Sequence, residues 1–73
     1  MIEATTKNGL DVWVAFNPDC EYNTGGFYCE IWENPDMDCL LDDFCIHIDD
    51  CDCTDLDVVE QYAKDYVSGL VID

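Results

Sequence analysis

The chain has 73 residues and a formal net charge of −16, from 18 carboxylates against Lys7 and Lys64. So few cations exclude direct binding to DNA, RNA or anionic lipid, because affinity for phosphate groups comes from lysine and arginine. The length allows one domain with one small core, and a hydrophobic content of 49% predicts that this domain folds despite its charge.

Segments with a period of two predict strands in the first half of the chain. Residues 1–6 alternate weakly, and the dipeptide Asn8-Gly9 then predicts a hairpin with a type I′ turn. Residues 10–16 and 27–33 alternate clearly, and a polar loop through residues 20–24 separates them. The inward faces of these two strands carry Leu10, Val12, Val14 and Phe16, and Phe27, Cys29 and Ile31.

The second half predicts one more strand and a helix. Residues 37–43 have the spacing of a single helical turn, and residues 44–48 alternate as a last strand with Phe44, Ile46 and Ile48 on one face. Thr54 followed by Asp57 has the pattern of a capping box, and Gly69 is a plausible helix end. Between them an apolar stripe falls at helical spacing: Leu56, Val59, Ala63, Tyr66, Val67 and Leu70.

This order predicts an α+β fold, a single domain over residues 1–73 with an antiparallel three- to four-stranded sheet and one C-terminal helix packed on one face. The remaining residues, 70–73, are expected to form an extended tail. The sheet face away from the helix is expected to carry Trp13, Tyr28, Glu30, Trp32 and His47.

The carboxylates concentrate between residues 30 and 60, where no lysine or arginine interrupts them. Such a concentration produces a negative potential that attracts a basic surface. We therefore expect a protein partner rich in lysine and arginine, with an aromatic side chain among the acids as an anchor. The candidate partner-binding residues are Glu30, Trp32, Glu33, Asp36, Asp38, Asp42, Asp43, Asp49, Asp50, Asp52, Asp55 and Asp57.

The spacing of these acids suits a nucleic-acid mimic. Carboxylates two residues apart on a strand, such as Asp36 with Asp38 or Asp50 with Asp52, lie about 6.7 Å apart. Successive phosphates of one DNA strand rise about 3.4 Å along the axis while winding around it, so their through-space separation is larger and comparable. Arginine forks that hold phosphates also bind carboxylates bidentately. The alternative is a solvated surface that only keeps the protein soluble, for which a net charge of about −4 to −8 would be enough.

In size, charge and expected element order the chain resembles the small acidic DNA mimics that phages encode against bacterial defence, the anti-CRISPR and anti-restriction proteins. The resemblance covers no sequence motif and transfers no residue role. It implies an inhibitor in the bacterial cytosol whose target is a CRISPR effector complex or a restriction enzyme.

The cysteines and the histidine suggest a second hypothesis, a small zinc-binding module with Cys39, His47, Cys51 and Cys53 as ligands. No Cys-x-x-Cys pair supports it, and the EF-hand-like start at Asp50 fails to supply the required Gly and Glu. The first residues lack the basic and apolar regions of a signal peptide, so the six cysteines are expected to be reduced in a cytosol. A secreted chain would instead use them for disulfides.

A third hypothesis is an acidic interaction protein whose partner is unrelated to nucleic acid. Catalysis is not expected, because paired carboxylates need a cleft that separates their pKa values and a chain of this size has little room for one. No cofactor is expected either.

Overall fold

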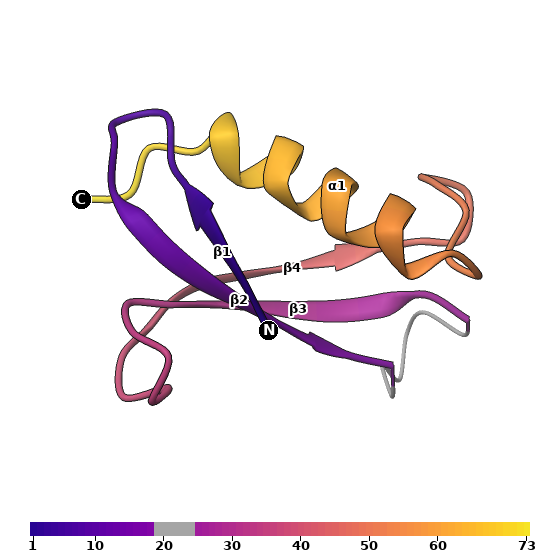
Figure 1. Ribbon diagram of the computed structural model, residues 1–73, viewed down its shortest axis with the longest axis horizontal. Coiled ribbons are helices and arrows are strands. Elements are labelled where there is room, and N and C mark those ends of the chain that lie inside the picture. The colour runs from indigo at the N-terminus through magenta and orange to yellow at the C-terminus, as the bar shows by residue number, and fades with distance from the viewer. Residues whose placement is uncertain (19–24) are drawn as a thin grey trace.

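The computed structural model describes residues 1–18 and 25–73, and the polar loop expected at residues 20–24 lies outside the described residues. The described chain forms one four-stranded antiparallel sheet in the order β1-β2-β3-β4, followed by a single helix, as Figure 1 shows. The predicted α+β fold is therefore confirmed. The elements are β1 (Ile2–Thr5), β2 (Asp11–Asn17), β3 (Phe27–Trp32), β4 (Leu40–Ile46) and α1 (Leu56–Ser68).

The β1–β2 hairpin forms where Asn8-Gly9 predicted it, but its turn is of another type. A type I′ turn needs a positive φ at both central residues, and in this turn only Gly9 has one, at 84°. The Gly9 N–H donates to the Thr6 carbonyl over 3.0 Å, and the Thr6 N–H donates to the Leu10 carbonyl over 2.9 Å. The loop is therefore a three-residue connection in which glycine takes the left-handed position.

The core lies between the sheet and α1. Val12, Val14, Ile31 and Ile46 are fully buried from the sheet side, as the period of two predicted. The buried residues of α1 are Val59, Ala63 and Val67. Two other members of the predicted helical stripe are exposed, Leu56 to 64% and Tyr66 to 40%. Leu56 stands at the very start of the helix, beyond the sheet, while the Tyr66 ring stacks on Phe44 with centroids 4.1 Å apart.

Strand β4 begins four residues earlier than expected, and the helical turn predicted at residues 37–43 is wrong. Leu40 pairs with Trp32 and Ile46 with Phe27, and a register shift beside Ile31 accommodates one extra residue in β4. Pairing with β3 therefore overrides the helical spacing of three apolar residues, as tertiary context often does. Ile48, expected inside, lies past the strand and is 59% exposed.

The helix begins one residue later than the capping-box pattern indicated. Asp55, and not Thr54, is the N-cap, and its side chain accepts a hydrogen bond from the Asp57 N–H at 3.0 Å. At the other end Gly69 is the C-cap, with a φ of −93°, so the predicted end is correct although it does not use a left-handed glycine. The tail then returns to the first hairpin, where the Lys7 N–H donates to the Leu70 carbonyl over 2.8 Å.

In the described parts of the chain no helix is both long and apolar enough to cross a membrane.

Candidate functional site

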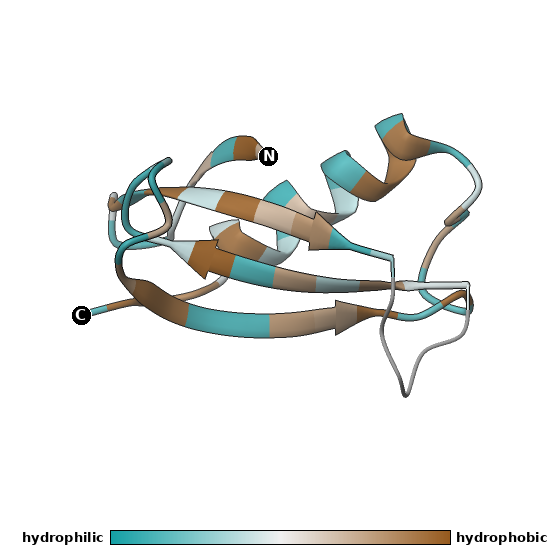
Figure 2. Cartoon of the chain, turned by 90° about the horizontal axis from the view of Figure 1, so that it is seen from below, coloured by the Kyte–Doolittle hydropathy of each residue, from teal (hydrophilic) through white to brown (hydrophobic). Residues whose placement is uncertain are grey.

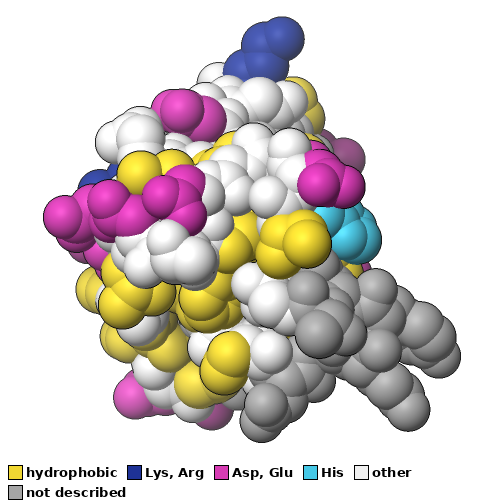
Figure 3. Space-filling view, turned by 90° about the vertical axis from the view of Figure 1, so that its right-hand side faces the viewer, with side chains coloured by type: hydrophobic (Ala, Val, Ile, Leu, Met, Phe, Trp, Pro, Cys, Tyr) yellow, Lys and Arg dark blue, Asp and Glu magenta, His cyan; other side chains and the backbone are white. Residues whose placement is uncertain are grey.

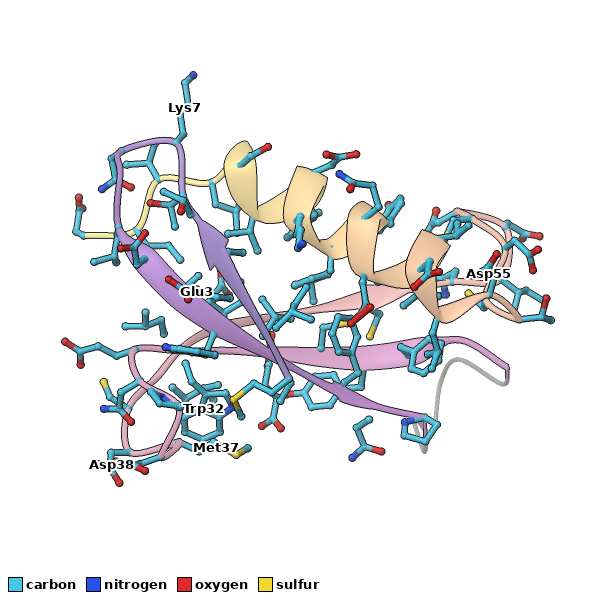
Figure 4. All side chains as sticks on the ribbon, viewed as in Figure 1. Glu3, Lys7, Trp32, Met37, Asp38 and Asp55 are labelled. Atoms are coloured by element: carbon cyan, nitrogen blue, oxygen red, sulfur yellow. The ribbon has the colours of Figure 1, made fainter. Side chains whose placement is uncertain are left out.

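Nine of the twelve nominated residues follow one edge of the molecule, which we call the acidic edge. It starts in the turn between β3 and β4, continues along β4, which is the last strand of the sheet, and ends in the first turn of α1. Figure 4 places Asp38 and Asp55 at opposite ends of the long axis, which measures 30 Å. The acidic edge comprises Asp36, Asp38, Asp42, Asp43, Asp49, Asp50, Asp52, Asp55 and Asp57.

At one end of the acidic edge the β3–β4 turn presents Asp36 and Asp38. The Asn34 side chain holds this turn, because its Oδ1 accepts hydrogen bonds from the backbone N–H groups of Asp36 at 3.1 Å and Asp38 at 3.5 Å. Met37 between them has a φ of 60°, which L-residues rarely adopt. The two carboxylates are exposed and are held apart from the sheet by a backbone that Asn34 fixes.

At the opposite end, in the β4–α1 loop, three carboxylates stabilise the backbone. Asp50 Oδ2 accepts from the His47 N–H at 2.9 Å, and Asp52 Oδ1 accepts from the N–H and the hydroxyl of Thr54 at 3.1 and 2.5 Å. These two bonds from Thr54 lower the pKa of Asp52. With the Asp55 cap, the loop therefore uses acids both to hold its shape and to present charge.

Figure 3 looks onto this end of the molecule and shows hydrophobic side chains lying between acidic ones. Ile48 and Leu56 are the most exposed large apolar residues of this segment, at 59% and 64%. Asp49, next to Ile48, is exposed as well. Exposed apolar side chains beside carboxylates are typical of surfaces that bind another protein.

The other three nominated residues belong to β3 and its end. Glu30 and Trp32 point to the sheet face away from α1, because Cys29 and Ile31, which alternate with them along β3, are buried in the core. Glu33 follows the strand, and its N–H donates to the Cys39 carbonyl over 3.0 Å. The structure therefore divides the nominated residues between the acidic edge and this second surface.

We call the sheet face away from α1 the outer face, and Figure 2 views the sheet from that side. It carries Trp13, Tyr28, Glu30 and Trp32 as the sequence predicted, but not His47, which lies beyond the end of β4. Trp13 and Trp32 are directly opposite each other on neighbouring strands. The indole Nε1 of Trp32 is buried and has no hydrogen-bond partner among the described residues.

The outer face also holds residues that were not nominated, among them Trp13 and Glu3. Glu3 is directly opposite Trp13 on β1. The alternation of residues 10–16 had already assigned Trp13 to this face, but Trp13 and Glu3 lie outside the acidic stretch on which the nomination rested. Combining the period of two with the strand order, rather than counting charges, would have found both.

The hydrogen bonds that the described carboxylates accept come from hydroxyl, amide and backbone N–H groups. Tyr28 donates its hydroxyl to Asp43 Oδ2 at 2.7 Å, and Gln61 donates its amide to Asp65 at 3.0 Å. Lys7 projects from the β1–β2 turn, away from the acidic edge (Figure 4). The negative charge of the acidic edge is thus not neutralised within the described chain.

The proposed zinc ligands do not come together. Cys39 precedes β4, whereas His47, Cys51 and Cys53 follow it. Among the residues that the structure describes, no three His, Cys, Asp or Glu side chains are arranged to hold a metal ion, and no disulfide joins the cysteines. The Cys53 thiol contacts the His47 carbonyl at 3.6 Å. Burial raises the pKa of the Cys53 thiol, and the neighbouring Cys51 raises it further.

The described surface, residues 1–18 and 25–73, has no pocket, so its features are edges and faces. Comparison with protein-family models, curated proteins and solved structures finds no match to this chain.

Proposed function

We propose that this protein is an inhibitor that occupies the lysine- and arginine-rich nucleic-acid groove of a bacterial defence protein in the host cytosol, with a CRISPR effector complex as the first target to test and a restriction enzyme as the second. The protein acts by binding and not by catalysis. The observation that carries the proposal is the acidic edge, whose carboxylates extend along the 30 Å length of the molecule.

The length of this edge suits a groove built for nucleic acid. One strand of B-DNA rises about 3.4 Å per phosphate, so 30 Å corresponds to about nine phosphates. The nine carboxylates of the acidic edge run from Asp36 and Asp38 in the β3–β4 turn, through Asp42 and Asp43 on β4, to the β4–α1 loop and the start of α1. A cationic groove that binds these carboxylates in place of nucleic-acid phosphates still forms charge-assisted hydrogen bonds.

The partition of roles along the edge indicates which acids to change. Asp50, Asp52 and Asp55 accept backbone hydrogen bonds, whereas Asp36 and Asp38 extend from a turn that Asn34 holds. Replacement of Asp by Asn keeps an acceptor oxygen and removes the charge. Asparagine variants therefore test the charge without removing the structural bonds.

The experiment is a competition assay with a purified CRISPR effector and labelled DNA at several salt concentrations. We expect the protein to displace DNA and its affinity to fall steeply as salt rises. One variant carries D49N, D50N and D52N, and a second carries D36N, D38N and D42N. A matched control removes three charges away from the acidic edge: D11N, D65N and D73N.

Both edge variants should lose inhibition by more than the control does. If the control loses as much as the edge variants, net charge and not the acidic edge determines binding. A complex that survives excess DNA would contradict the proposal and favour an interaction protein unrelated to nucleic acid.

A further inference from the structure

The outer face carries two cross-strand rows that combine aromatic rings with carboxylates. In the first row Glu3 on β1 is opposite Trp13 on β2, which is opposite Trp32 on β3. In the second row Ala15 on β2 is opposite Glu30 on β3, which is opposite Asp43 on β4. The rows are neighbours, because their members are two residues apart along β2 and along β3. Every charged side chain in these rows is a carboxylate.

The pair of Glu30 and Asp43 costs stability in the isolated protein. Two like charges directly opposite each other on one sheet face repel. The Tyr28 hydroxyl engages Asp43 Oδ2 at 2.7 Å but brings no positive charge, and Ala15 on the other side of Glu30 brings none either. A cation placed over this pair would remove the repulsion.

The pair of Trp13 and Trp32 decides which cation fits best. Directly opposed residues on neighbouring strands have Cβ atoms about 5 Å apart, so the outer face carries two half-buried indoles on adjacent strands. An arginine guanidinium stacks on such a ring and donates at the same time to a carboxylate in its plane, whereas a lysine ammonium is a compact and strongly hydrated charge. Glu3, opposite Trp13, and Glu30, two residues from Trp32 along β3, supply carboxylates on the same face.

We propose that the outer face binds arginine side chains of the basic partner, stacked on Trp13 and Trp32 and paired with Glu3 or Glu30. This proposal rests on the proposed function, since it names the residue type in the partner groove that the outer face recognises. The acidic edge supplies long-range attraction, and the outer face supplies the preference for arginine over lysine.

The test uses oligoarginine and oligolysine peptides of equal length, with affinity measured by titration calorimetry and contact followed by the amide NMR signals of Trp13, Glu30 and Trp32. We expect oligoarginine to bind at least about fivefold more tightly than oligolysine at equal salt, because of the cation–π contribution. The W13T variant, which keeps a good strand former, should lose this preference and retain its affinity for oligolysine. The D65N variant, which removes one charge from α1 outside both surfaces, is the control and should keep the preference.

A second variant guards against misfolding of W13T. E30Q removes the repulsion with Asp43, so it should unfold at a higher denaturant concentration than the parent and still bind oligoarginine several-fold more weakly. Equal affinity for both peptides, or a preference that survives in both W13T and E30Q, overturns this inference and leaves the proposed function standing. Failure to bind either peptide overturns both.

Discussion

Tyr28 and Asp43 are joined across strands β3 and β4 by a hydrogen bond of 2.7 Å from the phenol to Oδ2 of the carboxylate. This bond and the negative charges around it raise the pKa of Tyr28 from 10.0 to about 12. The phenolate would have to form beside Asp43 and Glu30, and the folded protein resists that.

The Tyr28 phenol should therefore titrate well above an ordinary tyrosine. Because the pKa is raised in the folded state, its contribution to stability is fully present below pH 10.0 and is lost as the pH rises toward about 12. Replacing Asp43 with asparagine should bring the pKa of Tyr28 back toward 10.0, as ultraviolet titration of the phenolate would show. The D42N variant is the control, and an equal shift in D42N would contradict the assignment.

Removal of the Thr54 side-chain hydroxyl should raise the pKa of Asp52. The T54V variant loses the hydroxyl bond of 2.5 Å, the first cause of the lowered value, and keeps the backbone bond. A lowered pKa gives stability that is present at neutral pH and is lost as acid protonates the carboxylate. The parent should therefore retain the β4–α1 loop to lower pH than T54V does. Carboxyl carbon shifts measured by NMR against pH report this, and an unchanged Asp52 titration in T54V would exclude the hydroxyl as the cause.

Because Asp55 is the helix N-cap, two substitutions at this position should differ in their effect on stability. The D55A variant removes the N-cap acceptor and should lower the free energy of unfolding by about 1 kcal/mol. The D55N variant keeps an acceptor of similar quality and should unfold close to the parent, although its charge is reduced as much. Urea unfolding of the two variants separates capping from charge, and equal losses in D55A and D55N would assign the effect to charge.

The left-handed residue of the β3–β4 turn predicts a stabilising change. Met37 has a φ of 60°, where a side chain costs about 1–2 kcal/mol that glycine does not incur. Since glycine also gives the unfolded chain more freedom, M37G should raise the free energy of unfolding by up to about 1 kcal/mol. The M37V variant should have the opposite effect, because a β-branched residue resists this conformation. The free energy of unfolding in urea should therefore be highest for M37G, intermediate for the parent and lowest for M37V. Greater stability of M37V than of M37G would contradict this account of the turn.

The sequence was sufficient for the elements whose pattern agrees with their packing. Val12, Val14 and Ile31 alternate with residues of the outer face, and Val59, Ala63 and Val67 follow helical spacing, so these core positions were predicted correctly. Elements whose bounds depend on pairing with a distant part of the chain were not predicted correctly. The start of β4 depends on pairing with β3, which no local spacing encodes.

The candidate site shows the same division. The concentration of charge, with an aromatic anchor, nominated the acids of the edge together with Glu30 and Trp32, but it could not show that Glu30 is opposite Asp43 or that Trp32 is opposite Trp13. Both relationships depend on strand register. The same holds for the loop acids Asp50 and Asp52, whose backbone partners are set by the turn geometry.

Strand β4 ends the sheet, and its acids have a consequence for how copies of the protein meet. A terminal strand ordinarily offers its backbone as a template to another molecule. Here two copies aligned along β4 would bring Asp42 and Asp43 of each against the same residues of the other, and the irregular pairing near Leu40 bends the strand as well. At neutral pH we therefore expect copies of the protein not to pair along β4. Acidification that protonates these carboxylates removes this protection, so precipitation should begin in acid before the fold itself is lost.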